Sequence, residues 1–172
     1  MDQITLDRIQ TLHPRVRQEV DNIYRNQIVP ALSGTATCRF AYTLRTFAEQ
    51  NAIYAQGRTR LFDANGNRLG IVTKAKGGQS IHNYGLALDI VLINNRQASW
   101  QTNIDFDKDG RADWMEVVNI FKANGWEWGG DWKFKDRPHF QKALGYDWRT
   151  LLQKWNSGDT FIDTNGIKYV NL

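Results

Sequence analysis

The stretch that most constrains the fold is residues 80–93, Ser-Ile-His-Asn-Tyr-Gly-Leu-Ala-Leu-Asp-Ile-Val-Leu-Ile. Its second half is rich in aliphatic and β-branched residues and contains no proline, which predicts a buried strand. Asp89 lies inside this strand, between Leu88 and Ile90. A carboxylate in apolar surroundings costs free energy unless it is paired with another charge or bound to a metal ion. The sequence therefore predicts that the strand carries a polar site.

Two histidines supply the other members of such a site. His82 stands seven residues before Asp89, where the strand has not yet begun, and His139 follows Asp136 and Pro138. Two imidazoles and one carboxylate form a common catalytic zinc set that leaves a fourth position for water. Our central hypothesis is a zinc site made by His82, Asp89 and His139. Spacing alone leaves an alternative open, in which His82 is a hydrogen-bonded loop residue and Asp89 a salt-bridged strand residue.

Length and composition limit the classes of protein to consider. A chain of 172 residues with 41% hydrophobic residues and seven tryptophans predicts one globular domain with a substantial core. No apolar run approaches the 18 or so residues of a membrane span. Residues 1–8 show no basic start followed by an apolar stretch, so we expect no secretory signal. Cys38 is the single cysteine, which excludes an internal disulfide.

The charge is unevenly distributed along the chain. Five of the 18 acidic residues fall within residues 105–116, and without them 22 basic residues stand against 13 acidic ones, a balance of +9. A cationic surface suits an anionic partner. Composition alone does not decide whether this partner is nucleic acid, a membrane surface or a bacterial wall polymer. A soluble basic protein without such a partner is the plainer interpretation.

Periodicity predicts helices and strands on either side of the central strand. Apolar residues at three- and four-residue spacing predict helix over residues 4–29, divided at Pro14. We expect a short strand over 38–44, a polar loop over 58–79 and a C-terminal hairpin over 159–172 with Asn165-Gly166 at its turn. Further expected elements are helices over 45–57 and 114–124, and a short strand and a helix within 139–155.

Residues 105–116 match the calcium-loop pattern D-x-[DN]-x-[DN]-G-x5-E at every fixed position. Oxygen atoms at alternate positions and a bidentate glutamate would surround a hard cation, and glycine at the sixth position permits the sharp turn. The predicted calcium ligands are Asp105, Asp107, Asp109, Arg111, Asp113 and Glu116. Two features depart from the pattern: residues 97–104 do not predict an entering helix, and the eighth position is Ala112. An acidic turn that caps helix 114–124 is the alternative.

A hydrolase built on the zinc site also needs a proton carrier and a cation for the oxyanion. Zinc lowers the pKa of bound water to about 7, which makes hydroxide available at neutral pH. Asp136 lies three residues before His139 and is our candidate general base. Arg45, at the corner between a predicted strand and helix, is our candidate for stabilising the tetrahedral intermediate.

Several motifs resemble one family. Residues 80–89 resemble the S-x-H-x-x-G-x-A-x-D signature of the M15 zinc peptidases, and residues 126–140 resemble the W-G-G-D-W…D-x-P-H-F segment of their L-alanyl-D-glutamate endopeptidase branch, found in phage endolysins and bacterial wall hydrolases. Residues 12–17 and 45–59 are also similar to that branch. The resemblance runs from about residue 10 to about residue 145. The acidic loop resembles a segment of some of these endolysins in which calcium is implicated.

The resemblance implies a fold and a set of roles. It implies an α+β, hedgehog/D-Ala-D-Ala peptidase-like domain in which a small antiparallel sheet carries the zinc site and helices pack around it. The zinc ligands would be His82, Asp89 and His139. The roles implied for the remaining positions are catalysis by Asp136 and Arg45 and substrate binding by Gln50 and Ser80. Gln50 also matches a residue that orients others, and carboxypeptidases of the superfamily more often have Glu where this chain has Asp136.

The expected activity follows from the resemblance. We expect a monomeric zinc metallopeptidase of 172 residues in one domain, with 156–172 as a hairpin extension of open role. Its substrate would be the peptidoglycan stem peptide, cut at the L-Ala–D-Glu bond, with Zn²⁺ and a calcium ion as the candidate cofactors. No nucleic acid or stable membrane partner is expected. The absent signal fits a phage endolysin made in the cytoplasm and released to the wall. A D-Ala-D-Ala carboxypeptidase or dipeptidase and a non-catalytic, zinc-containing wall-binding protein are the alternatives.

Overall fold

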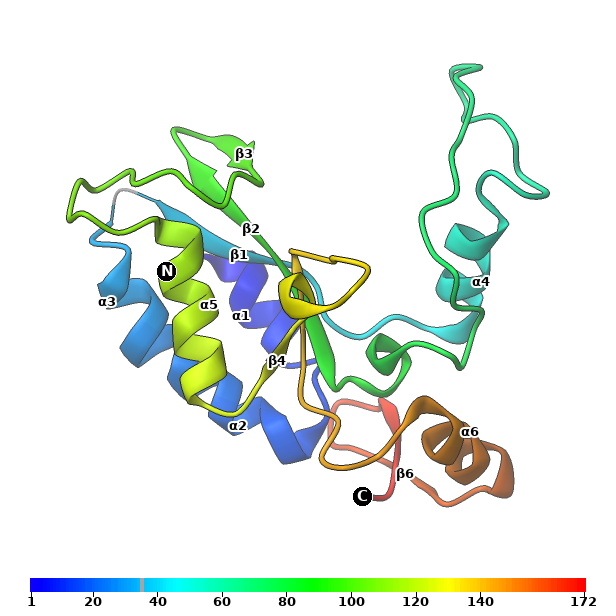
Figure 1. Cartoon of the computed structure of the whole chain (residues 1–172). Coiled ribbons are helices and arrows are strands. Elements are labelled where there is room, and N and C mark those ends of the chain that lie inside the picture. Colours follow the sequence, from blue (N-terminus) through cyan, green and yellow to red (C-terminus); the bar gives the residue numbers. More distant parts are fainter. Residues whose placement is uncertain (35) are drawn as a thin grey trace.

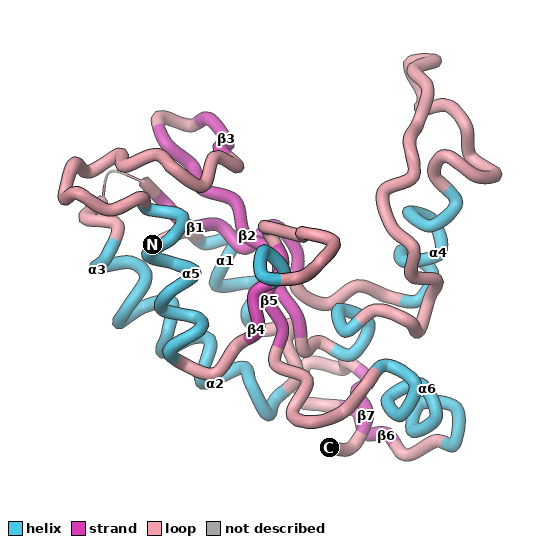
Figure 2. Tube along the Cα trace, in the orientation of Figure 1, coloured by secondary structure: helices cyan, strands magenta, loops and turns pink. Residues whose placement is uncertain are grey.

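A small antiparallel sheet stands at the centre of the computed structural model, which describes residues 1–34 and 36–172. The strand order is β1-β2-β5-β4, and β3 pairs with the far end of β2 (Figures 1 and 2). The strands are β1 (Thr37–Tyr42), β2 (Ala87–Asn94), β3 (Gln97–Ser99), β4 (Glu127–Trp128) and β5 (His139–Gln141). The predicted α+β class is confirmed.

Helices surround this sheet. The α-helices are α1 (Gln3–Ile9), α2 (Pro14–Ile23), α3 (Val29–Ala31), α4 (Phe47–Ala55), α5 (Asp113–Ala123) and α6 (Trp148–Ser157). A π-helical turn, η1 (Tyr24–Ile28), follows α2, and two 3₁₀ turns, η2 (Ile81–Tyr84) and η3 (Gly129–Asp131), precede β2 and β5. Figure 1 shows α1, α2 and α5 together on one side of the sheet, whereas α4 and the long loop after it stand on the other side. In the described part of the chain no helix combines the length and hydropathy that a membrane crossing requires.

The alternation of β2 explains how one strand serves both a core and a site. Successive side chains of a strand point to opposite faces. Leu88, Ile90 and Leu92 are fully buried in the core that the sheet shares with the helices. Asp89 therefore points to the opposite face. Burying each large aliphatic side chain contributes roughly 1.5–3 kcal/mol, so the core face fixes the register of the strand and with it the direction of Asp89.

The observed elements differ from the predicted ones mainly at their ends. β1 contains a bulge between Phe40 and Tyr42 and ends at Tyr42, two residues before the predicted end. Thr46 caps α4 through a capping box with Glu49, so Arg45 lies ahead of the helix. Pro14 begins α2 as predicted, but residues 24–28 form a π-turn where a regular helix was expected. Such turns leave no sequence signal that periodicity can detect.

The C-terminal hairpin forms as predicted, from β6 (Thr160–Ile162) and β7 (Lys168–Val170). It packs on the junction of α1 and α2. His13 Nε2 lies 3.0 Å from the Val170 carbonyl oxygen, and Arg17 forms a 2.7 Å ion pair with Asp163. His13 is buried and its Nδ1 accepts from the backbone N–H of Arg15, which agrees with a structural role for this histidine.

Candidate metal centre

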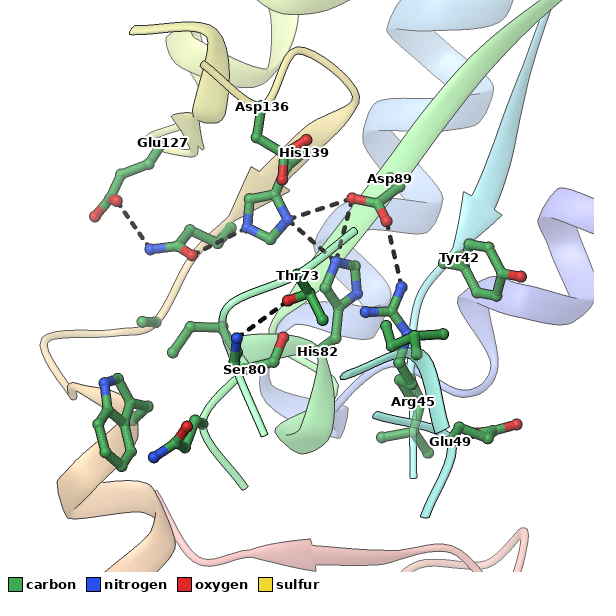
Figure 3. Close-up of a pocket in the computed structure, with 18 of the residues that line it drawn as sticks. Tyr42, Arg45, Glu49, Thr73, Ser80, His82, Asp89, Glu127, Asp136 and His139 are labelled. Atoms are coloured by element: carbon green, nitrogen blue, oxygen red, sulfur yellow. Dashed lines mark hydrogen bonds and ion pairs between the residues drawn. The ribbon is translucent and has the colours of Figure 1, made fainter. Parts of the chain in front are cut away.

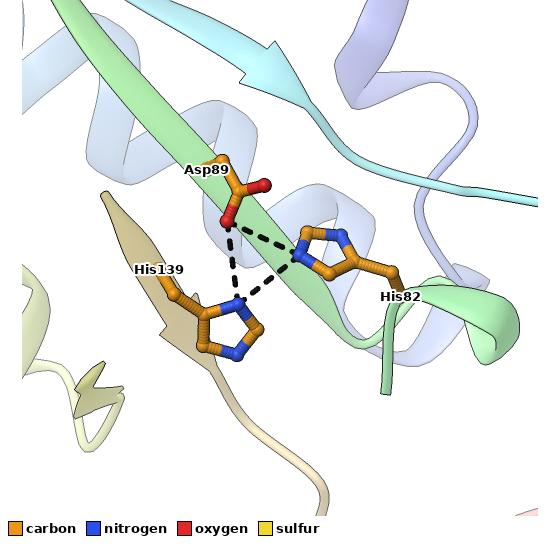
Figure 4. Close-up of side chains that lie close together, drawn as sticks. All are labelled: His82, Asp89 and His139. Atoms are coloured by element: carbon orange, nitrogen blue, oxygen red, sulfur yellow. Dashed lines mark hydrogen bonds and ion pairs between the residues drawn. The ribbon is translucent and has the colours of Figure 1, made fainter. Parts of the chain in front are cut away.

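Asp89 and His139 are direct neighbours across the sheet. The register of β2 and β5 sets Asp89 opposite His139, so the two side chains share a face and lie within reach of each other. His139 Nδ1 lies 3.3 Å from Asp89 Oδ1 (Figure 4). Pairing of the strands is therefore sufficient to bring together two residues that are 50 positions apart in the chain.

His82 reaches the same point from the turn before β2. Gly85 ends η2 in the left-handed conformation, with φ of 69°, and a Cβ there would meet the backbone N of His13 at 2.7 Å. The turn thus needs glycine, and it directs His82 back over Asp89. His82 Nε2 lies 3.2 Å from Asp89 Oδ1 and 3.1 Å from His139 Nδ1.

The three facing atoms suit a cation. The other nitrogen of His82, Nδ1, lies 2.7 Å from the carbonyl oxygen of Thr43, which can only accept, so Nδ1 carries the proton and Nε2 offers a lone pair. Lone pairs from two nitrogens and a carboxylate oxygen converging at 3.1–3.3 Å repel one another unless a positive charge lies between them. Bonds of about 2.0–2.1 Å around tetrahedral zinc give ligand separations of about 3.3–3.4 Å, so the residues present fit such an ion.

The pKa shifts of Asp89 and His139 show how strongly the charges of the cluster interact. Burial raises the pKa of the Asp89 carboxyl, but the two imidazoles outweigh burial and hold this pKa well below its usual range. Burial lowers the pKa of the His139 imidazole, but its hydrogen bond to Asp89 more than compensates, so this pKa lies above its usual value. Both pKa shifts thus reflect the close contact between Asp89 and the two imidazoles.

Arg45 lies beside the cluster. Its Nη2 is 3.6 Å from Asp89 Oδ2, and its backbone N–H donates to the carbonyl oxygen of His82 at 3.0 Å (Figure 3). Gln50 Oε1 accepts from Arg45 Nη1 at 3.0 Å, and Gln50 Nε2 donates to the Ala75 carbonyl oxygen at 2.8 Å. Gln50 is only 1% exposed. Its contacts therefore fit the orienting role, and it offers no surface to a substrate.

Asp136 lies in a tight loop between η3 and β5. Its backbone N–H donates to the Gly129 carbonyl oxygen at 2.9 Å, and a Cβ on Gly129 would lie 2.3 Å from the Asp136 carbonyl oxygen, so the loop closes only around glycine. Desolvation raises the pKa of the Asp136 carboxyl, although the charge of His139 acts in the opposite direction. Its carboxylate accepts no hydrogen bond from another described residue, which leaves it available to water.

A groove of about 1290 Å³ opens over these residues. Its floor includes His82, Asp89 and His139. Asp136 and Ser80 line it as well, whereas Trp132 flanks His139 with ring centroids 5.1 Å apart. The groove thus brings together the predicted metal ligands, Arg45, Asp136 and Ser80, and leaves Gln50 behind Arg45.

The acidic loop is a separate region at the start of α5. Ligand atoms of Asp105, Asp107 and Asp109 lie within 4.8 Å of one another. Asp113 and Glu116 lie on the first turn of α5 and are buried. One carboxylate oxygen in each of Asp107, Asp113 and Glu116 is buried without a hydrogen-bond partner among the described residues.

Sequence reasoning missed the residues that hold the histidines. These are the carbonyl group of Thr43 behind His82, and Gln141 with Glu127 behind His139. Alternation along β5 places Gln141 on the same face as His139, two residues away, and is the one signal that could have identified it. Thr43 acts through its backbone, which leaves no trace in the sequence.

Comparison with known proteins agrees with the motifs. A sequence model of the M15 peptidase family, described as D-alanyl-D-alanine carboxypeptidase, matches residues 73–142. The chain is 44% identical over 132 residues to the peptidoglycan L-alanyl-D-glutamate endopeptidase CwlK of Bacillus subtilis (strain 168). This alignment covers 76% of this chain and 72% of CwlK. A crystal structure of the L-Ala D-Glu endopeptidase ChiX of Serratia marcescens aligns with a TM-score of 0.49 and 22% identity, over 80% of this chain and 85% of ChiX.

Proposed function

The chain belongs to the M15 family of metallopeptidases, and from this premise we propose that it is a zinc-dependent hydrolase that cleaves the L-Ala–D-Glu bond of peptidoglycan stem peptides. The observation that carries the proposal is the convergence of His82, Asp89 and His139 in a chain so similar to CwlK. Two imidazoles and a carboxylate are a donor set typical of catalytic zinc. The ion, when bound, would supply Lewis-acid chemistry at the scissile carbonyl and acidify a water molecule.

The other side chains of the groove have roles in this proposal. Asp136 accepts a proton from the water that attacks the L-Ala carbonyl carbon, and it returns that proton to the amine of D-Glu as the C–N bond breaks. Its raised pKa favours such a two-way carrier. The Arg45 guanidinium, held by Gln50, faces the developing oxyanion.

Removing the proton carrier tests the catalytic role. We predict that Asp136→Ala lowers kcat about 10²–10⁴-fold, because proton transfer is lost, while the metal content stays unchanged. Asp131→Asn is the matched control, since Asp131 ends η3 just before this loop and pairs with Lys122 at the surface. Hydrolysis of purified peptidoglycan and metal analysis would measure both effects. A non-catalytic wall-binding protein predicts that neither quantity changes.

A D-Ala-D-Ala carboxypeptidase or dipeptidase is the second candidate, favoured by the description of the family model that matches residues 73–142. The two activities release different amino termini. Labelling the new termini after digestion of purified peptidoglycan decides between them: D-Glu agrees with our proposal, and D-Ala with the second candidate.

We further propose that residues 105–116 bind a calcium ion. Three buried carboxylate oxygens without partners, on Asp107, Asp113 and Glu116, support a cation in the loop because such atoms are costly when left unpaired. Burial and the neighbouring carboxylates raise the pKa values of Asp113 and Glu116, which reflects the same unbalanced charge. The remaining ligands would be Asp105, Asp109 and the carbonyl oxygen of Arg111.

A further inference from the structure

His139 makes a second contact on the side away from Asp89 and His82. Its Nε2 lies 3.0 Å from Gln141 Oε1, and Gln141 Nε2 donates to Glu127 Oε2 at 3.0 Å (Figure 3). The sheet creates this row of side chains. His139 and Gln141 are two residues apart in β5, and the register of β4 sets Glu127 directly opposite Gln141. A continuous line of hydrogen bonds therefore leads from the metal centre to a carboxylate at the rim of the groove.

Glu127, the last residue of this row, determines the direction of every hydrogen bond in it. A carboxylate only accepts hydrogen bonds, so Glu127 requires the NH₂ group of Gln141 to face it. The amide oxygen of Gln141 must then face His139. That oxygen also only accepts, so Nε2 of His139 carries a proton, and a neutral imidazole then keeps its lone pair on Nδ1. Without Glu127, the Gln141 amide could turn over and favour the opposite tautomer, which has no free electron pair on Nδ1.

The two histidines of the cluster differ in what determines their tautomer. His82 is set by the carbonyl oxygen of Thr43, a backbone atom that no substitution removes. His139 depends on two side chains, of which Glu127 is exposed. The tautomer of one ligand is thus fixed by the fold and that of the other by residue identity.

We propose that Gln141 and Glu127 are positioning residues that hold His139 in its Nε2–H tautomer and thereby set the affinity of the metal centre. The proposal rests on the proposed function, in which His139 is a metal ligand. Groups that orient a ligand histidine typically contribute 10–100-fold to metal affinity. Neither residue is required to touch the substrate in this role.

Two single substitutions and one exchange test the proposal. Glu127→Gln removes the fixed direction of the row, and Gln141→Leu removes the acceptor at similar volume. Each should weaken Zn²⁺ binding about 10–100-fold, measured by competition with a chelator. Asp131→Asn, which also removes one negative charge from a nearby exposed residue, should leave the affinity unchanged. Glu127→Gln combined with Gln141→Glu restores an acceptor beside His139 and should recover most of the affinity.

A measurement on metal-free protein is independent of the metal. ¹⁵N NMR of the imidazoles, at a pH where they are neutral, should show a larger share of the Nε2–H tautomer of His139 in the wild-type protein than in Glu127→Gln, while Asp89 favours a proton on Nδ1 equally in both proteins. Because Glu127 is exposed, this variant is expected to fold even if Gln141→Leu does not. Unchanged affinity and an unchanged His139 tautomer in Glu127→Gln would overturn the inference.

The two proposals can fail separately. If His139→Ala binds Zn²⁺ as tightly as the wild-type protein, the proposed metal centre is wrong, whereas the tautomer measurement still decides the role of Glu127. If His139→Ala loses the ion but Glu127→Gln keeps full affinity, the proposed function stands and the positioning role of Glu127 is rejected.

Discussion

The cluster of His82, Asp89 and His139 and the acidic loop of residues 105–116 are built in opposite ways. The cluster gathers three side chains from a turn and two strands, and it contains one carboxylate. The loop gathers five carboxylates from twelve consecutive residues. Each histidine of the cluster has a partner on its outer nitrogen, whereas the loop leaves three carboxylate oxygens buried without partners among the described residues.

This difference concerns what holds each region in shape. The sheet and its core fix the cluster, because the register of β2 and β5 places Asp89 opposite His139 whether or not an ion is present. The loop depends on its own carboxylates, which accept backbone N–H groups within the loop, such as that of Gly110 by Asp105 Oδ2. Five like charges so close together favour the folded loop only when a cation balances them. We therefore expect the cluster to control activity and the loop to control stability.

The largest expected effect comes from removing one carboxylate in each region. Asp89→Asn should lose the metal ion and reduce hydrolysis by about 10³-fold or more, because several kcal/mol of transition-state stabilisation depend on the ion. Asp107→Asn should keep both the cluster metal and most of the activity. Metal analysis and the rate of release of new amino termini from peptidoglycan measure the two effects. Equal losses in both variants would break the distinction between a catalytic cluster and a stabilising loop.

A smaller effect is expected on stability, and here the acidic loop should matter more than the cluster. Calcium at 100 times its dissociation constant should stabilise the fold by about 2.7 kcal/mol. For a domain of this size that corresponds to a rise in Tm of roughly 5–10 °C. Glu116→Gln should abolish the rise, because the bidentate ligand is lost, and Asp131→Asn should retain it. Thermal unfolding with and without calcium measures the rise in Tm. A wild-type Tm that calcium does not change would refute calcium binding by residues 105–116.

The two regions also differ in how far sequence reasoning could reach. The loop could be found by pattern because its acidic residues have the fixed spacing of a calcium loop. The cluster could be proposed because an acidic residue in an apolar strand is costly, but spacing alone left a hydrogen-bonded His82 and a salt-bridged Asp89 open, and the resemblance to the M15 peptidases favoured the metal site. The face on which Asp89 lies follows from alternation with the buried Leu88, Ile90 and Leu92. The start of α2 at Pro14 was likewise signalled by residue type.

What remained hidden depends on pairing between distant segments. Residue types predict a short strand within 139–155, but β4, with two residues, and β5, with three, are too short for the sequence to indicate which strands pair and in which register. Their register nevertheless decides that Glu127, Gln141, His139 and Asp89 form one row. The partner of His82 is a backbone atom, and the burial of Gln50 follows from a loop that closes over α4, so neither could be inferred from residue identity.

The third histidine provides the smallest effect and a control for the other two. Both nitrogens of His13 are used, since Nδ1 accepts from Arg15 and Nε2 donates to Val170, so His13 has no free lone pair for an ion. Burial lowers the pKa of its imidazole below the usual value of about 6.5. The folded state therefore binds this proton less readily than the unfolded state does. The stabilisation is complete above pH 6.5 and is lost as the pH falls below it, by at most about 1.4 kcal/mol per pH unit.

Replacing His13 should consequently flatten the acid side of the stability profile. His13→Asn keeps an N-cap for α2 but has no imidazole to protonate. Between pH 7 and pH 5, its free energy of unfolding should fall less steeply than that of the wild-type protein, as measured by urea denaturation without added metal. Zinc affinity should be unchanged in this variant, because His13 faces the C-terminal hairpin and not the groove. A loss of zinc affinity would mean that the link between His13 N and the Gly85 carbonyl oxygen transmits strain to His82, and the cluster would then depend on more than the sheet.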